Sequence, residues 1–148
     1  MPIDPKAQRI IDACESEYDA NKSDCNKFVR AVGADIGVPI VAGNADAIVD
    51  NLTTNWTSIA DGTAAKEKAD GGNFVIAGLK GKDHNPSRKN GHVAVVVSGP
   101  LDTTYNMYPT GYWGMLGVAE PEYGKKDTLN YAWKAVDVDN VKYFFKSF

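Results

Sequence analysis

The sequence predicts an α+β fold in which N-terminal helices pack on an antiparallel sheet. Up to about residue 70, apolar side chains recur three or four positions apart, which is helical spacing. After Gly71 and Gly72 the pattern changes to short apolar runs rich in β-branched residues, which is typical of strands. Helices that precede the strands, instead of alternating with them, favour α+β over a parallel α/β fold.

Four helices are expected in the first half of the chain. The first is expected at about 5–18 and the second from 23 or 24 to 36. The third should begin near 44, and the fourth should cover about 63–69. The polar stretch 19–22 should end the first helix. Ser23 or Asp24 can cap the second helix, which Gly37 and then Pro39 should end. The residues expected to face the core are Ile10, Ile11, Cys14, Tyr18, Phe28, Val29, Val32, Ile36, Ala45, Ile48, Val49 and Leu52.

Strands are expected in the second half, at 74–79, 92–97, within 104–112 and at 136–145. Between the first two lies a polar loop, residues 80–91, that is rich in turn-forming residues. This basic loop carries four cationic side chains, Lys80, Lys82, Arg88 and Lys89.

The length and the charge limit the possible functions. A chain of 148 residues is expected to form one domain, 1–148. The net charge of -3 and the pI near 5.3 argue against nucleic acid as the main partner. Because no apolar run is long enough to cross a bilayer, no membrane insertion is expected. The N-terminus does not resemble a secretory signal, so the protein is expected to be made in the cytoplasm.

The two cysteines, Cys14 and Cys25, are a poor disulfide pair because both are expected on helices, eleven residues apart. A metal site that combined them with His84 and His92 would lack the closely spaced ligand pairs of structural zinc. Neither a metal nor another cofactor is therefore expected.

Cys25 is the candidate nucleophile. It is expected in the first turn of the second helix, where free backbone N–H groups and the positive end of the helix dipole favour a thiolate. Such a position predicts a lowered pKa, although the neighbouring Asp24 opposes it unless that side chain caps the helix. The alternative is that Cys25 is a small buried hydrophobic residue, as Cys14 is expected to be.

His92 is the candidate general base, because it opens an apolar strand directly after Gly91, which permits a close approach of the backbone. A neutral imidazole there could take the proton of the thiol. The alternative is a structural histidine at a strand end. His84, in the basic loop, is expected to be solvated.

Five blocks of the sequence together resemble a known family. They are Cys25-Asn-Lys-Phe-Val-Arg-Ala-Val, Gly37-Val-Pro-Ile, Gly43-Asn-Ala-Asp-Ala-Ile-Val-Asp50, Phe74-Val-Ile-Ala-Gly-Leu-Lys-Gly81, and Gly91-His92 through Gly99-Pro100. In this order they are similar to the first family of type VI secretion amidase effectors, which are papain-like cysteine peptidases of the NlpC/P60 type.

The resemblance implies a fold, an activity and partners. Members of that family cleave the γ-D-glutamyl–diaminopimelate bond of peptidoglycan stem peptides. They are injected by one bacterium into the periplasm of another, and the producer makes a cognate immunity protein. On matching positions Cys25 would be the nucleophile and His92 the general base, with backbone N–H groups of the Cys25 helix in the oxyanion hole.

Two features depart from the family's pattern. The basic loop is longer than expected, and residues 108–114, a segment expected beside the active site, contain no cysteine. Asn106 and Thr110 are therefore the candidates for a third catalytic residue, and a site without either of them also remains open. Two other hypotheses remain open, a housekeeping or phage-type cell-wall peptidase and a catalytically inactive binding module on the same scaffold.

Overall fold

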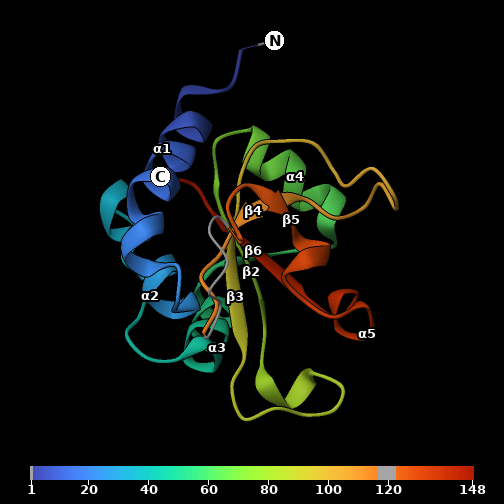
Figure 1. Cartoon of the computed structure of the whole chain (residues 1–148). Coiled ribbons are helices and arrows are strands. Elements are labelled where there is room, and N and C mark those ends of the chain that lie inside the picture. Colours follow the sequence, from blue (N-terminus) through green and yellow to red (C-terminus); the bar gives the residue numbers. More distant parts are fainter. Residues whose placement is uncertain (1, 117–122) are drawn as a thin grey trace.

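The computed structural model describes residues 2–116 and 123–148 and confirms the predicted α+β fold (Figure 1). The helices, in chain order, are α1 (Pro5–Asn21), α2 (Cys25–Ile36), α3 (Ala45–Asn55), α4 (Gly62–Asp70) and α5 (Ala135–Val138). The strands are β1 (Thr57–Ile59), β2 (Phe74–Leu79), β3 (His92–Val96), β4 (Thr110–Tyr112), β5 (Asp127–Thr128) and β6 (Lys142–Lys146). Short 3-10 turns lie at Gly81–Asp83 and Leu129–Tyr131.

Side-chain caps fix where the longer helices begin. Each cap accepts a hydrogen bond from a backbone N–H two or three residues later, which satisfies a donor that has no partner within the helix. The capping residues are Asp4, Asp24, Asn44 and Asp61. Asp24, and not Ser23, is therefore the cap of α2. Gly37 ends α2 in the left-handed region, with a φ of 78°, as its position in the sequence predicted.

The first helix is longer than predicted, because the polar stretch 19–22 does not end it at Tyr18. Helix α1 continues to Asn21, whose amide donates a hydrogen bond to the Glu17 carbonyl one turn earlier. Polar residues on the exposed face of a helix do not interrupt its backbone hydrogen bonds, so they are weak stop signals.

The described residues form one six-stranded sheet in the order β1-β6-β2-β3-β4-β5, and every neighbouring pair is antiparallel. The central pair, β2 and β3, begins and ends at the predicted residues to within one position. In their register Leu79, the last residue of β2, lies opposite His92, the first residue of β3. The basic loop 80–91 connects these two ends.

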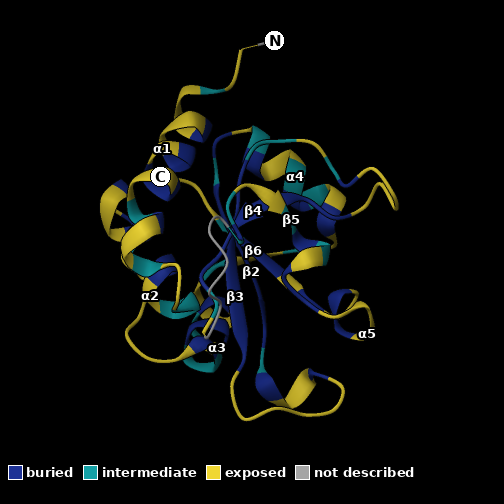
Figure 2. Ribbon diagram, in the orientation of Figure 1, coloured by how far each residue is buried: buried dark blue, intermediate teal, exposed yellow. Residues whose placement is uncertain are grey.

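Helices cover both faces of the sheet (Figure 1). Because side chains alternate along a strand, one set packs on α1, α2 and α3, and the other on α4 and the C-terminal segment. In β2, Ile76 belongs to the first core and Val75 and Ala77 to the second. Figure 2 shows the central strands buried throughout, which explains why their sequences are continuous apolar runs.

The predicted strand at 136–145 is wrong in its first half. The chain forms the one-turn helix α5 and then β6, which pairs with both β1 and β2. The helical turn buries the side chains of Asp137 and Val138 and leaves Val136 exposed. Asp137 accepts a hydrogen bond from the Asn85 backbone N–H at 2.7 Å, and this contact with the basic loop favours a turn over a strand.

No helix in the described parts of the chain is long and apolar enough to cross a bilayer.

Candidate active site

Cys25 is the first residue of α2. The preceding Asp24 accepts a hydrogen bond from the Lys27 backbone N–H at 3.2 Å and so sets where the helix begins. Gly114 lies against this helix start, where a Cβ atom would come within 2.6 Å of the Asp24 carbonyl oxygen. As expected, residues 108–114 therefore end beside Cys25, and the close approach needs a glycine.

His92 is the first residue of β3, and its side chain is buried. The preceding Gly91 passes so close to α3 that a Cβ atom would lie 2.5 Å from a carboxylate oxygen of Asp46. The predicted close approach at Gly91 is therefore confirmed. The imidazole packs edge-on against the ring of Trp133, with 4.9 Å between the ring centroids. Its Nε2 atom is buried and has no hydrogen-bond partner among the described residues.

One pocket of about 450 Å³ brings the two predicted residues together. Asp24, Cys25 and Asn26 line it from α2, and Asn44 and Ala45 line it from the start of α3. The remaining lining residues are Arg88, Asn90, Gly91, His92, Met115 and Leu116. The site thus lies where the helical layer meets the end of a central strand.

A larger cavity, of about 700 Å³, lies beside β1 and β6. Its lining includes Asp83, Asp139 and Lys142 but neither a cysteine nor a histidine. Volume alone would favour that cavity, but the two residues that could do nucleophilic chemistry, Cys25 and His92, are both in the lining of the smaller pocket. We therefore take the smaller pocket as the candidate active site.

The predicted lowering of the Cys25 pKa is wrong. Burial raises the pKa of the thiol, and it outweighs the backbone N–H groups of Val93, Asn26 and Cys25 itself, which lower it. The negative charge of Asp24 raises the pKa further, even though Asp24 caps the helix. At neutral pH the thiol of Cys25 is therefore protonated.

The pKa of His92 is lowered to about 3, first by burial and then by electrostatic interaction with Arg88 and His84. The imidazole is therefore neutral at neutral pH. A neutral imidazole has a free nitrogen lone pair, so it can accept a proton. The pair at rest is thus a thiol and an imidazole and not a thiolate and an imidazolium.

His84 is buried, so its predicted solvation is wrong. The 3-10 turn at Gly81–Asp83 folds the basic loop back on itself, and the His84 Nδ1 atom donates a hydrogen bond to the Lys80 carbonyl at 2.9 Å. The backbone N–H of the next residue, Asn85, donates a hydrogen bond to the Asp137 carboxylate. Contacts between distant segments therefore remove His84 from water, although its sequence neighbours are polar.

Neither candidate for the third catalytic residue lines the pocket. Asn106 lies in a turn at a φ of 54°, and the Thr110 hydroxyl donates a hydrogen bond to the Pro100 carbonyl at 2.6 Å. The side chain found against His92 is instead Trp133, a residue of the C-terminal segment. No sequence pattern links Trp133 to His92, since the two residues lie on segments far apart in the chain.

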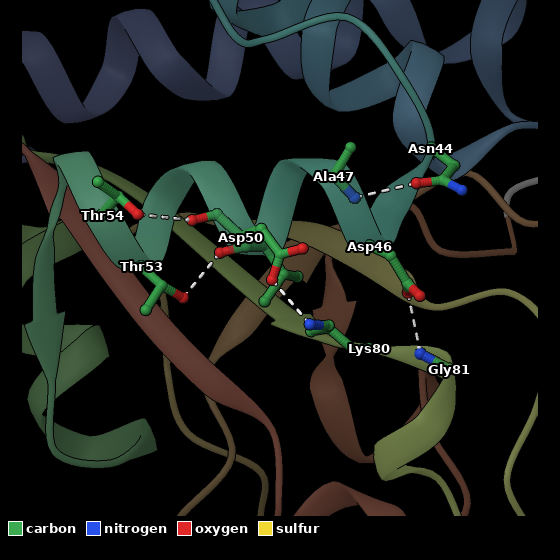
Figure 3. A network of polar contacts seen from close by, with 9 residues as sticks. Asn44, Asp46, Ala47, Asp50, Thr53, Thr54, Lys80 and Gly81 are labelled. Carbon is green, nitrogen blue, oxygen red and sulfur yellow. Dashed lines mark hydrogen bonds and ion pairs between the residues drawn. The ribbon is translucent and has the colours of Figure 1, made fainter.

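Of the four cationic residues of the basic loop, Arg88 alone lines the pocket. Lys80 forms an ion pair with Asp50 of α3 at 2.8 Å, as Figure 3 shows. Both cysteines are free, and Cys14 is fully buried in the core as predicted. Within residues 2–116 and 123–148, three or more His, Cys, Asp or Glu side chains nowhere gather as they would around a metal ion.

Comparisons with known proteins place the chain in a family. No family model matches it. The chain is similar to the peptidoglycan amidase Tse1 of Pseudomonas aeruginosa, with 38% identity over 152 aligned positions that cover 98% of this chain and 94% of Tse1. Two chains this similar over nearly their whole lengths share a fold, which here is NlpC/P60-like. The protein therefore belongs to the family of Tse1, the type VI secretion amidase effectors.

Proposed function

We propose that this protein is a peptidoglycan amidase that cleaves the γ-D-glutamyl–diaminopimelate bond of stem peptides. In this proposal Cys25 is the nucleophile and His92 is the general base. One observation carries it: a single pocket contains a cysteine at a helix start and a buried neutral histidine, in a chain 38% identical to a peptidoglycan amidase.

The first half of the reaction forms a thioester. Because the resting thiol is protonated, His92 removes its proton as the sulfur attacks the γ-carbonyl carbon of the glutamyl residue. Backbone N–H groups in the first turn of α2 have no partner within the helix and stabilise the negative oxygen that forms. The amide carbon–nitrogen bond then breaks, and His92 returns the proton to the leaving amine of diaminopimelate.

The second half releases the acyl group. The neutral His92 takes a proton from a water molecule, which attacks the thioester carbon. The carbon–sulfur bond breaks, the glutamyl γ-carboxylic acid leaves, and the proton held by His92 returns to the Cys25 sulfur. Each group ends in its starting state, as turnover requires.

Purified muropeptides test this proposal directly. We expect the wild-type protein to release fragments with a new glutamyl γ-carboxylate, identified by mass spectrometry. Cys25→Ala should reduce the rate by at least about a thousandfold, because it removes the nucleophile. Cys14→Ala removes the other thiol, which lies in the core, and should leave cleavage intact in the folded fraction. Cleavage by Cys25→Ala at a tenth of the wild-type rate would overturn the assignment.

We further propose that the protein is an injected antibacterial toxin, delivered by a type VI secretion system into the periplasm of a target bacterium. Membership of the effector family supports this role. A producer of such an enzyme needs protection from neighbouring cells of its own kind, so a cognate immunity protein that blocks the pocket belongs to the same proposal.

A further inference from the structure

Arg88 is the one cationic side chain that lines the candidate active site in the described residues. Lys80 forms an ion pair with Asp50, and Lys82 and Lys89 lie outside the pocket lining. Arg88 is exposed and forms no ion pair with any described residue. Its guanidinium is therefore free to bind an anion that enters the pocket.

The backbone at Arg88 is held in place by α3. The Arg88 N–H donates to the Gly81 carbonyl at 2.8 Å, and the Gly81 N–H donates to the Asp46 carboxylate at 2.9 Å. Figure 3 shows the second of these bonds beside the Lys80–Asp50 ion pair. The Arg88 backbone is thus linked through Gly81 to the helix whose cap, Asn44, lines the same pocket. Such anchoring lowers the entropy cost of binding through Arg88.

The other charged residue of the pocket lining is Asp24, an anion. Without a nearby cation, Asp24 would repel a negatively charged substrate. A guanidinium presents two parallel N–H groups that match the two oxygens of a carboxylate. The pocket is therefore suited to a substrate that carries a carboxylate close to the bond attacked by Cys25.

We propose that Arg88 determines specificity by binding the free α-carboxylate of the D-glutamyl residue whose γ-amide is cleaved. This inference rests on the proposed function. The α-carboxylate belongs to the same residue as the scissile carbonyl, and Arg88 and Cys25 line the same pocket, as binding both groups of one glutamyl residue requires. Stem peptides in which this carboxylate is amidated have no negative charge at that point and are poor substrates.

The electrostatics of the site agree with this role. The positive charge of Arg88 contributes to the low pKa of His92. A bound carboxylate offsets that charge, so it makes His92 a stronger base when the correct substrate is present. Recognition and proton transfer are then coupled through Arg88.

Two peptide substrates that differ only in this carboxylate test the inference. One contains γ-linked D-glutamate with a free α-carboxylate, and the other contains the α-amide. We expect wild-type kcat/KM to be at least about tenfold higher for the free acid, as a charged hydrogen-bonded pair implies. Arg88→Gln should reduce that preference to near unity, mainly through KM for the acid. Lys89→Gln, which removes one positive charge from the same loop outside the pocket, should keep it.

Three outcomes would overturn the inference. Equal wild-type kcat/KM for the two peptides would show that the carboxylate is not recognised. An equal loss on both peptides in Arg88→Gln, with the preference unchanged, would show that Arg88 acts otherwise, while cleavage that depends on Cys25 would leave the proposed function standing. If neither peptide nor intact muropeptides were cleaved in a way that depends on Cys25, the proposed function would fail, and the inference with it.

Discussion

Cys25 and Cys14 show how two thiols of one chain differ through their surroundings. Cys14 is fully buried in the core between α1 and the sheet, and burial raises its pKa well above the ordinary value. Cys25 is only partly buried and faces a pocket, but its pKa is also raised. The two thiols therefore differ in how accessible they are from the pocket, since neither is a thiolate at neutral pH.

Alkylation of the folded protein by iodoacetamide should therefore modify Cys25 and spare Cys14. Because the thiolate is the reacting form, the rate at Cys25 should keep rising with pH through and above the ordinary thiol range. Peptide mapping of samples quenched between pH 5 and 10 measures both sites. A rate at Cys25 that is constant from pH 5 to 8 would instead indicate a thiolate–imidazolium pair.

His92 should make the stability of the protein depend on pH. Its pKa is about 3 in the folded protein and about 6.5 in an unfolded chain. Between these values the unfolded state binds more protons, so the free energy of unfolding falls as the pH falls through this window. From pH 7 to 5 the contribution of His92 amounts to a loss of roughly 2 kcal/mol.

Urea unfolding of the wild type and of His92→Gln at pH 7, 6 and 5 measures this contribution. The variant lacks the titrating group, so its stability should fall less than that of the wild type over the same range. Parallel curves for the two proteins would mean that His92 is not buried in its neutral form.

At the scale of the element, the start of α2 combines two opposing effects of one residue. Asp24 stabilises the helix because its carboxylate accepts the Lys27 N–H. The same negative charge raises the pKa of Cys25, which begins the helix. The cap therefore contributes stability and, together with burial, favours the protonated form of the Cys25 thiol.

Replacing Asp24 separates these effects. Asp24→Asn keeps a capping oxygen but removes the charge, so it should lower the Cys25 pKa and cost little stability. Asp24→Ala removes both and should lower the free energy of unfolding by about 1 kcal/mol. Urea unfolding and the pH dependence of alkylation are the two measurements. If Asp24→Asn left the alkylation profile of Cys25 unchanged, the charge of Asp24 would not act on the thiol.

At the scale of the whole molecule, the site is assembled across two layers. Cys25 comes from the helical layer and His92 from the centre of the sheet, where β2 and β3 are buried on both faces. The C-terminal segment contributes Trp133, whose ring packs edge-on against the imidazole of His92. Elements from both halves of the chain must therefore be in place before the pocket exists.

The proposed toxin should act where peptidoglycan is accessible, on the outer side of the cytoplasmic membrane. Fused to a periplasmic export signal in a Gram-negative host, it should lyse the cells, and Cys25→Ala should not. Produced in the cytosol of the same host, it should be tolerated. Culture turbidity after induction measures both. Toxicity restricted to the cytosol would refute a cell-wall substrate, and toxicity independent of Cys25 would favour a binding module.

The sequence alone determined the features that depend on near neighbours. The start of α2 to within one residue, the left-handed glycine after it and the bounds of β2 and β3 follow from local hydrogen bonding and from continuous runs of apolar, β-branched residues. The sequence also placed Cys25 at the opening of a helix and His92 at the opening of a strand, and the structure shows both residues in the lining of one pocket.

Tertiary structure alone decided the features that depend on distant segments. The edge strands β1 and β5 contain three and two residues, too few to show a period, and exist because a neighbouring strand pairs with them. Distant segments also cause the burial of His84, the packing of the Trp133 ring against His92 and the raised pKa of Cys25. Loss of water around a group depends on everything that packs against it, and a sequence pattern shows only its chain neighbours.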